Sequence, residues 1–437
     1  MKKISILVLS LFVLLACSED DDNDGNPKKS DAKEITSFVF LATDNDGLDQ
    51  EIKSTIDSEK KTVSITVPAN LDVTSLKPTV TISDKAAISP KNKVAVDFTN
   101  KVTYTVTAEN GSQVTYSVQI TKAMPAREVL IAIYTANPGN GLPWDLNEPN
   151  LSRWTGVTLT DGKVTKLHLD AVRLRVLPSV IGDLVDLDTL KIRGNELKQI
   201  PPEIGKLTNL KALHLSENEI KTLPNTIGNL KELTHLNVGH NTLSTLPKTL
   251  VNLKDNLRNL RCQNNPFFTF PEVIFSLSNL EVLNVGESEL GIVPEEINTL
   301  IHLEFLGLSK NKLGSLPAAI GGLKRLKHLE AEGMDIRQLP TQIGNLTALT
   351  ILSVQNNTIT SLPSTIGKLE KLKKLNLSQN LLTSLPLEMG RLERLEELDV
   401  TSNNALVVFP RLLCDLVEKN NIKVLGGDVE SRCPYFK

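Results

Sequence analysis

The fold is decided by a 23-residue stretch, LKALHLSENEIKTLPNTIGNLKE at residues 210–232, because the chain repeats its pattern many times. Each repeat has leucine-like residues at fixed offsets, usually an Asn, then Leu-Pro and often Ile-Gly-x-Leu. A fixed period in this range predicts a solenoid, in which each unit buries its apolar side against the next. All steps are 23 residues except the fourth, which is 24; the eleven repeats begin at Val164, Leu187, Leu210, Leu233, Leu257, Leu280, Leu303, Leu326, Leu349, Leu372 and Leu395.

Each part of the repeat has a physical role. The segment Leu213-x-Leu215 is typical of a short strand whose alternate residues point inward. Asn218 turns the chain, and its amide can satisfy backbone groups that the stack would leave unpaired. The Pro, present in every repeat, fixes φ and starts a short helix or 3-10 segment. The Asn is replaced in three repeats, by Val172, Ser288 and Met334, which predicts local irregularity within the same fold.

The complete motif is Leu-x-x-Leu-x-Leu-x-x-Asn-x-Leu-x-x-Leu-Pro-x-x-Ile-Gly-x-Leu. Residues 164–410 thereby resemble the leucine-rich repeat family, most closely its plant-type and Ras-suppressor-like 23-residue classes. This resemblance implies an α/β solenoid with a parallel β-sheet on the concave face and short helices or 3-10 turns on the convex face. It also implies that ligands contact the outward strand residues of the concave face.

Residues 124–163 precede the repeats and are predicted to form their N-terminal cap. Residues 129–134 favour a short helix, and both tryptophans of the chain, Trp144 and Trp154, lie here. The run from Trp144 to Val157 resembles the cap of plant-type leucine-rich repeat proteins, although the Cys pair of that cap is missing. Bulky aromatic side chains are expected to cover the apolar edge of the first repeat. The alternative is that the Trp pair stacks on sugar rings.

Residues 411–437 follow the repeats as a predicted C-terminal cap. Residues 412–417 favour a helix and residues 422–425 a last strand. Cys414 and Cys433 lie in this tail, and in an oxidising exterior they are expected to form a disulfide; two free thiols are the alternative. Cys262 occupies an inward strand position, which predicts a buried, inert thiol.

Residues 34–123 have a different character. Segments 35–40 and 62–67 alternate with period two, and segments 103–107 and 115–120 flank Asn110-Gly111, a strong hairpin signal. These short strands predict a small all-β sandwich. The segment resembles the immunoglobulin-like modules that precede ligand-binding domains in Bacteroidetes surface lipoproteins. That resemblance implies a stalk that holds the solenoid away from the membrane.

The N-terminus resembles an export signal. Two lysines precede an apolar run at residues 4–16 that is too short to span a bilayer, so residues 1–16 are predicted to be a signal peptide. Leu14-Leu15-Ala16-Cys17 resembles a bacterial lipobox, which implies cleavage before Cys17 and acylation of that residue; a plain signal peptide is the alternative.

An acidic segment at residues 18–25 lies within a predicted tether, residues 17–33. It resembles the signal that sends Bacteroidetes lipoproteins to the outer face of the outer membrane; a mere spacer is the alternative. We therefore expect an outer-membrane protein that faces the exterior and contacts the membrane through its lipid anchor only.

Composition argues against several classes of function. The net charge is −3, without the basic stripe that nucleic acid requires, so no nucleic-acid partner is expected. The four Cys exclude a disulfide-dense scaffold. The sequence has no Gly-rich phosphate loop, Ser nucleophile elbow or metalloprotease helix motif, so neither an enzyme nor a cofactor is predicted.

The candidate binding residues are outward residues of the predicted strands. The first half of the concave face is basic and rich in His, and the second half turns acidic at Glu330 and Glu332. Several apolar residues beside Arg261 and His328 resemble the anchors of a protein interface; scattered surface apolar residues are the alternative. The predicted site comprises Lys191, Arg193, His214, His235, Arg261, Val282, Phe305, His328, Glu330 and Ile351.

A metal site is not expected. His214 and His235 fall on neighbouring strands, but no Cys, Asp or Glu completes a ligand set with them. The sequence therefore favours a non-enzymatic surface lipoprotein that binds a protein, of host or bacterial origin, on its concave sheet. The alternatives are a glycan-binding lipoprotein of a polysaccharide-uptake system and a structural or adhesive surface protein.

Overall fold

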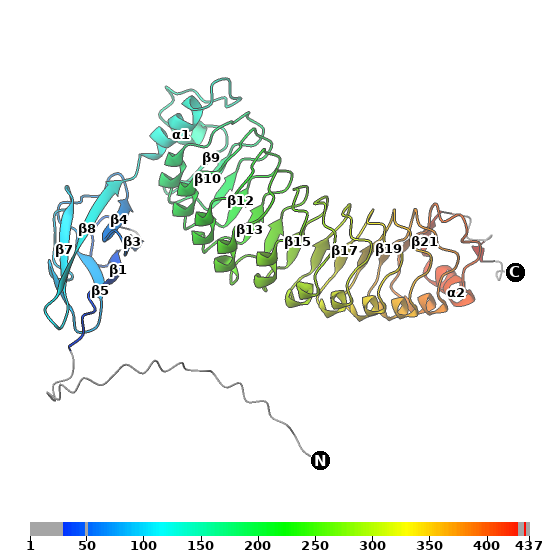
Figure 1. Cartoon of the computed structure of the whole chain (residues 1–437). Helices are drawn as coiled ribbons and strands as arrows, with labels where there is room; N and C mark the ends of the chain where they lie inside the picture. Colours follow the sequence, from blue (N-terminus) through cyan, green and yellow to red (C-terminus); the bar gives the residue numbers. More distant parts are fainter. Residues whose placement is uncertain (1–28, 49–50, 427–431, 434–437) are drawn as a thin grey trace, which may run out of the picture. The chain divides into compact units, whose positions relative to one another are not determined.

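The structure is a computed structural model that describes residues 29–48, 51–426 and 432–433. The chain forms an N-terminal unit that ends at Lys122 and a repeat unit that begins at Ala123, each with its own apolar core (Figure 1). The predicted signal peptide, Cys17 and the acidic segment 18–25 lie outside the described residues. Among the helices that are described, none is long and apolar enough to cross a membrane.

The N-terminal unit is all-β. It contains a three-stranded sheet in the order β2-β1-β5 and a five-stranded sheet in the order β3-β4-β8-β7-β6. The predicted hairpin is present as the antiparallel pair β7 and β8, whereas the parallel pairing of β4 with β8 was not predicted. The strands are β1 (Ile35–Phe40), β2 (Ile52–Lys53), β3 (Thr55–Asp57), β4 (Thr62–Val67), β5 (Pro78–Ile82), β6 (Ala87–Ser89), β7 (Val102–Thr107) and β8 (Gln113–Lys122).

Aromatic rings fill the core of the N-terminal unit. Phe38 packs edge-to-face against Tyr104, with the ring centroids 5.3 Å apart, and Phe40 packs in the same way against Phe98 at 5.5 Å. The Tyr104 hydroxyl is buried and has no hydrogen-bond partner among the described residues. Burial raises the pKa of Tyr104 to about 12, because the apolar surroundings disfavour the phenolate.

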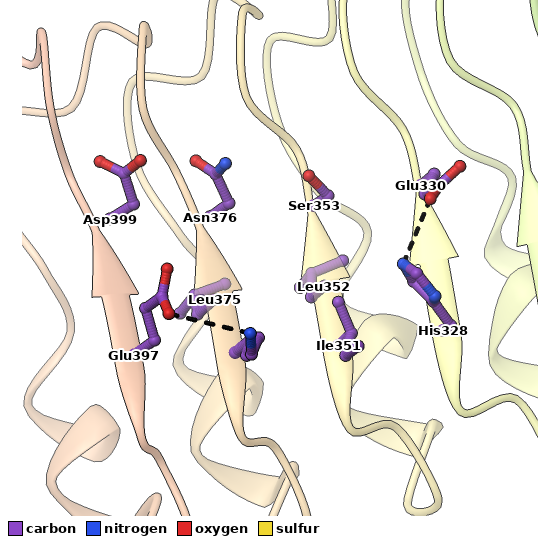
Figure 2. Close-up of a pocket in the computed structure, with 10 residues that line it drawn as sticks. His328, Glu330, Ile351, Leu352, Ser353, Leu375, Asn376, Glu397 and Asp399 are labelled. Atoms are coloured by element: carbon purple, nitrogen blue, oxygen red, sulfur yellow. Dashed lines mark ion pairs between the residues drawn. The ribbon is translucent and has the colours of Figure 1, made fainter. Parts of the chain in front are cut away.

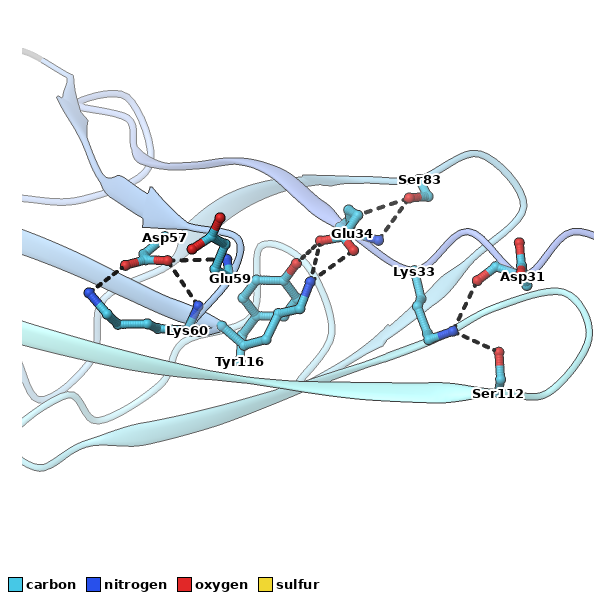
Figure 3. A network of polar contacts seen from close by, with 10 residues as sticks. Asp31, Lys33, Glu34, Asp57, Glu59, Lys60, Ser83, Ser112 and Tyr116 are labelled. Carbon is cyan, nitrogen blue, oxygen red and sulfur yellow. Dashed lines mark hydrogen bonds and ion pairs between the residues drawn. The ribbon is translucent and has the colours of Figure 1, made fainter.

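A polar network fixes the start of β1 (Figure 3). The Glu34 carboxylate accepts hydrogen bonds from the Tyr116 hydroxyl and from Lys61 Nζ, the latter at 2.9 Å. The backbone N–H of Glu34 donates to Ser83 Oγ at 2.8 Å. The hydrogen bonds from Tyr116 and Lys61 lower the pKa of Glu34, since both favour the ionised carboxylate. The network thus ties residue 34 to strand β8 and to the residue that precedes β4.

The repeat unit is a leucine-rich repeat solenoid, as predicted, with one 13-stranded sheet that runs in chain order from β9 to β21. Neighbouring strands pair in parallel except β9 and β10, which are antiparallel. The strands are β9 (Val157–Thr160), β10 (Lys163–His168), β11 (Thr189–Lys191), β12 (Ala212–His214), β13 (His235–Asn237), β14 (Asn259–Arg261), β15 (Val282–Asn284), β16 (Phe305–Gly307), β17 (His328–Glu330), β18 (Ile351–Ser353), β19 (Lys374–Asn376), β20 (Glu397–Asp399) and β21 (Lys423–Leu425).

The opposite layer consists of 3-10 turns, each of which follows the Pro of its repeat. Most contain a Gly that allows two turns to stack closely: a Cβ on Gly344 would lie 2.3 Å from the carbonyl oxygen of Thr365 in the next repeat. The turns are η2 (Ser179–Asp183), η3 (Pro202–Lys206), η4 (Asn225–Asn229), η5 (Lys248–Leu253), η6 (Glu272–Ser276), η7 (Glu295–Thr299), η8 (Ala318–Gly322), η9 (Thr341–Asn345), η10 (Ser364–Lys368) and η11 (Leu387–Arg391).

The close stacking of the turns is interrupted once. Val251 in η5, Phe275 in η6 and Asn298 in η7 occupy the position that is Gly in most repeats. Turns η5, η6 and η7 pack less closely against one another than the other turns do. Figure 1 shows that the stacking direction of the repeats changes near β15, at the same place in the repeat unit.

Buried asparagines link successive repeats, as the sequence predicts. Asn357 is 7% exposed, and its Oδ1 accepts hydrogen bonds from the backbone N–H groups of Met334 and Ile336, both at 3.0 Å. Its Nδ2 donates to the carbonyl oxygens of Ala331, Val354 and Gln355, at 2.8, 2.9 and 3.1 Å. The side chain therefore satisfies backbone groups in two repeats at once.

Local differences lie beside two of the three replaced asparagines. Ser288 and Met334 are both fully buried, so the repeats stay closed at these positions. In the repeat before each of them, a short backbone hydrogen bond closes a tight turn: Thr269 N to Phe267 O at 2.6 Å, and Ser315 N to Leu313 O at 2.7 Å. The sheet itself continues without a break.

The N-terminal cap covers the first repeat with α1 (Ala126–Thr135), the turn η1 (Leu151–Arg153) and strand β9. Trp144 and Trp154 are 5% and 2% exposed, and their ring centroids lie 4.9 Å apart. The Trp144 Nε1–H donates to the carbonyl oxygen of Thr155 at 2.8 Å. Because both rings are buried in the core, they cap the solenoid and offer no face for a sugar.

Helix α2 (Arg411–Asn420) and strand β21 close the other end of the repeat unit, where a helix and a strand are predicted. Cys414 and Cys433 are joined by a disulfide. Cys262 is fully buried, and burial raises the pKa of its thiol, which makes it unreactive.

Candidate binding surface on the concave sheet

The parallel register arranges the outward strand residues in columns. In each strand from β11 to β20 the middle residue is buried, and the first and last residues point away from the core. Because each strand pairs in register with the next, equivalent residues become direct neighbours: His168 lies opposite Lys191, and Lys191 opposite His214. We refer to the first residues, Lys166 to Glu397, as the first column and to the last residues, His168 to Asp399, as the second column. The residues two positions further along, Asp170 to Thr401, form the third column.

A central cluster of four residues occupies the first column on β15 to β18: Val282, Phe305, His328 and Ile351. The His328 ring meets the edge of Phe305, with 5.0 Å between the ring centroids. On the other side, the Arg261 guanidinium lies 5.8 Å from the centre of the Phe305 ring. All four side chains are half-buried, so the cluster presents apolar surface between two nitrogen-bearing groups.

Glycines leave the surface of the sheet without side chains at two positions beside the central cluster. A Cβ on Gly307 would lie 2.7 Å from Asn284 Oδ1, and one on Gly239 would lie 2.7 Å from the Gln263 side chain. The amide side chains of Asn284 and Gln263 thus lie flat over neighbouring glycines. Gln263 Oε1 is buried and has no hydrogen-bond partner among the described residues.

A basic hollow of about 320 Å³ lies at the start of the concave sheet. Burial, and secondarily the charge of Lys191, lowers the pKa of both His168 and His214. The neutral form of these two imidazoles is therefore favoured near pH 7, and Lys166 and Lys191 carry positive charge in the hollow. Its lining residues are Lys166, His168, Thr189, Lys191, Ala212, His214 and His235.

An acidic hollow of about 190 Å³ lies toward the other end of the sheet. Figure 2 shows Glu330, Ser353, Asn376 and Asp399 in a row across four neighbouring strands. Two ion pairs form between residues that line the acidic hollow: His328 Nε2 lies 3.3 Å from Glu330 Oε1, and Lys374 Nζ lies 3.8 Å from Glu397 Oε2. Its outward lining residues are His328, Glu330, Ile351, Ser353, Lys374, Asn376, Glu397 and Asp399.

The predicted site residues fall into these three places, with one exception. Lys191, His214 and His235 line the basic hollow; Arg261, Val282, Phe305 and His328 form or flank the central cluster; Glu330 and Ile351 line the acidic hollow. The exception is Arg193, which is exposed, lies outside both hollows, and pairs with Glu217 Oε1 at 2.7 Å.

The structure adds lining residues that were not chosen from the sequence: Lys166, His168, Lys374, Asn376, Glu397 and Asp399. All of them belong to the first two columns, so comparing the charge at each end of a column would have identified Lys166, Lys374, Glu397 and Asp399, whereas His168 and Asn376 follow from their column position alone. His214 and His235 are not cross-strand partners, since His214 lies opposite Asn237 and His235 opposite Ala212. Within residues 29–48, 51–426 and 432–433, no group of three or more His, Cys, Asp or Glu could hold a metal ion.

Comparison with known families gives two matches. The family model described as "SGBP, N-terminal" matches residues 35–120. The model described as "Leucine-rich repeat region" matches residues 203–292 and 292–432, which is more than half of the chain. Among curated proteins, none matches the chain in sequence.

Several solved structures resemble the repeat unit. A leucine-rich repeat protein of Leptospira interrogans is 33% identical, with a TM-score of 0.50, over 58% of this chain and 69% of that one. The Arabidopsis receptor kinase HAESA, in complex with the peptide hormone IDA and the co-receptor SERK1, is 26% identical, with a TM-score of 0.50, over 66% of this chain and 59% of that one. The structure of PEPR1-AtPEP1 is 25% identical, with a TM-score of 0.51, over 66% and 46%. The chain thus spans only about half the length of the last two of these proteins.

Proposed function

Because the chain belongs to the leucine-rich repeat family, we propose that it is a non-enzymatic surface protein that captures a protein ligand on its concave sheet. The observation that carries this proposal is the central cluster. An aromatic ring, two aliphatic side chains and a guanidinium meet on a face that the fold itself does not need to fill. Aromatic and Arg side chains are the anchors that dominate protein interfaces.

The similar plant structures support a protein ligand. HAESA is solved with a peptide hormone and a co-receptor, so a related solenoid at 26% identity holds polypeptide ligands. The matched regions of this chain are similar to modules that bind other molecules. Their columns of solvated side chains supply contact area for a partner rather than an enclosed pocket for a catalysed reaction.

We further propose that the chain is an outer-membrane lipoprotein acylated at Cys17, with an immunoglobulin-like N-terminal unit as its stalk. The lipobox-like Leu14-Leu15-Ala16-Cys17 and the acidic segment 18–25 support this location. Mass spectrometry of the protein from its native membrane should find an acylated N-terminal peptide beginning at Cys17. A free, unacylated Cys17 there would contradict the anchor.

Glycan binding is the second candidate, and the "SGBP, N-terminal" match over residues 35–120 favours it. A glycan site usually offers Trp or Tyr platforms. In the concave columns of the described strands, Phe305 is the single phenylalanine, tryptophan or tyrosine, and Trp144 and Trp154 are buried. If a glycan binds, the N-terminal unit is therefore the better place to look for it than the concave sheet.

The test measures capture by the full chain and two variants. A partner is first isolated by cross-linking and purified, and its affinity is then measured. Phe305→Ala should weaken binding at least tenfold, because truncating a central interface anchor typically costs about 2 kcal/mol or more. Phe268→Ala is the matched control, since Phe268 is 63% exposed and lies away from the concave columns.

A glycan array run in parallel separates the two candidate functions. Glycan binding that survives Phe305→Ala, with no protein captured by the unmodified chain, would favour the second candidate. Equal affinities of the Phe305→Ala and Phe268→Ala variants for the purified partner would remove the central cluster from the binding site.

A further inference from the structure

Charge is separated along the concave face. In its outward positions, the first five repeats carry Lys166, Lys191, Arg193 and Arg261 against one acid, Asp170. The last six repeats carry the opposite set, Glu330, Glu332, Glu397 and Asp399 against one base, Lys374. The face is therefore positive at one end and negative at the other, although the whole chain is close to neutral.

Several of these charges have no counter-charge. Among the described residues, Lys166 and Lys191 in the first half and Glu332 and Asp399 in the second form no ion pair. At neighbouring positions of the repeat, by contrast, charged residues do form ion pairs. One residue before the strands, opposite charges pair across adjacent repeats: Lys327 with Glu304 at 2.7 Å, and Lys373 with Glu396 at 2.7 Å. These four charges are thus left free for a partner, whereas Arg193, Glu330, Lys374 and Glu397 form ion pairs within the chain.

The dimensions of the charged face fit an extended chain. From β10 to β20 there are ten strand spacings, or about 48 Å at about 4.8 Å each. The outward positions cover about four residues along each strand, a width of about 13 Å. A surface this long and narrow matches a segment of about 15 extended residues, at about 3.3 Å per residue.

We propose that the concave face binds an extended peptide segment of about 15 residues that has an acidic block at one end, apolar residues in the middle and a basic block at the other end. The acidic block lies over the basic hollow, the apolar residues over the central cluster, and the basic block over the acidic hollow. The inference rests on the proposed function and specifies the chemistry of the ligand.

One segment of the chain itself has a charge pattern similar to that of the proposed peptide, so it must be distinguished from an external ligand. Residues 18–24 are mostly acidic, and Lys28 and Lys29 follow. Between them stands Gly25-Asn26-Pro27, which has no large apolar side chain for Phe305. The apolar centre of the face therefore favours a peptide from another molecule over this segment of a second copy.

The experiment compares two synthetic peptides of the same composition on the full chain by fluorescence anisotropy. The block peptide has four glutamates, seven apolar or neutral residues and four lysines in that order; the scrambled peptide alternates the charges. The block peptide should bind at least tenfold more tightly in about 50 mM salt, and the preference should shrink in about 500 mM salt, where exposed charges are screened.

Charge-reversal variants locate the two ends. Lys166→Glu with Lys191→Glu, or Glu397→Lys with Asp399→Lys, should each reduce block-peptide affinity at least tenfold. All four substitutions together should restore binding of this peptide or of one with the block order reversed, because the ligand can then lie in the opposite direction. The control for the Lys166 and Lys191 variant, with the same change in net charge, is Lys221→Glu with Lys248→Glu, two exposed residues off the concave columns, and it should bind normally.

Three results overturn the inference: equal affinity for the block and scrambled peptides, binding of neither, or tighter binding of a peptide of residues 18–33 than of the block peptide. The proposed function fails separately. If capture of a partner is lost in Phe305→Ala while the block and scrambled peptides bind equally, protein capture by the central cluster is supported. That result would contradict only the proposed order of charges in the ligand.

Discussion

Replacing Asn357 with Ala should lower the unfolding free energy of the repeat unit by about 3 kcal/mol. The substitution leaves the buried N–H groups of Met334 and Ile336 without an acceptor, and it removes the donor to three carbonyls. A buried polar group that loses its partner costs about 1–3 kcal/mol, so the two N–H groups alone set a range of about 2–6 kcal/mol. Water that enters the space left by the amide reduces the cost toward the lower half of that range.

The assay is denaturant unfolding followed by tryptophan fluorescence. Trp144 and Trp154 are the only tryptophans and both lie in the repeat unit, so this signal reports the repeat unit and not the N-terminal unit. The matched control is Asn345→Ala: Asn345 is exposed in the preceding repeat, and its side chain makes no hydrogen bond within the described residues. It should change stability by no more than about 0.5 kcal/mol. A loss below about 1 kcal/mol for Asn357→Ala, or one equal to that of the control, would refute the role given to the buried asparagines.

Three more predictions concern the same unit. Gly344→Ala should destabilise it by about 1–3 kcal/mol in the same assay, because the new Cβ would lie 2.3 Å from Thr365 O, whereas Gly291→Ala, which has nothing within 4 Å, should be nearly neutral. Cys433→Ser should cost about 2–4 kcal/mol in oxidising buffer and nothing in reducing buffer, since the disulfide closes a loop with a sequence separation of 19; equal losses in both buffers would contradict this. The pKa of His168 and of His214 is lowered in the folded state, so unfolded imidazoles bind protons first as the pH falls through about 6.5. The repeat unit should therefore lose stability from pH 7 to 5.5, and His214→Gln should lose less; a pH profile unchanged by His214→Gln would argue against burial of that ring.

The period of the repeat made most of the solenoid predictable. Inward leucines fix the register of each strand, so the neighbours of Phe305, on β15 and β17, could be read from positions 23 residues away. The central cluster and the two charged ends of the columns follow from that register. The same reasoning missed the pairing of Arg193 with Glu217, because Glu217 lies one residue beyond the columns, in a turn with a φ of 57°. Strand alternation does not specify where such a side chain points.

The N-terminal unit shows the opposite case. The alternation in residues 62–67 predicts β4, and Val63, Ile65 and Val67 are its buried residues. Alternation says which face of a strand is buried, but it does not say which strand lies beside it. The parallel pairing of β4 with β8 joins segments more than fifty residues apart, and nothing local in either segment specifies it.

The two faces of the solenoid are coupled at the central cluster. Backbone hydrogen bonds hold the spacing of parallel strands at about 4.8 Å, so the sheet cannot widen when the convex turns are forced apart. The convex turns are packed less closely between η5 and η7, the turns that follow β13, β14 and β15, and Val251 and Phe275 stand there in place of Gly. Extra width on one face at constant spacing on the other can only appear as curvature, and Figure 1 shows the change of stacking direction there. We expect the spacing of these convex turns, which lie outside the predicted binding columns, to set the angle between the two ends of the concave face.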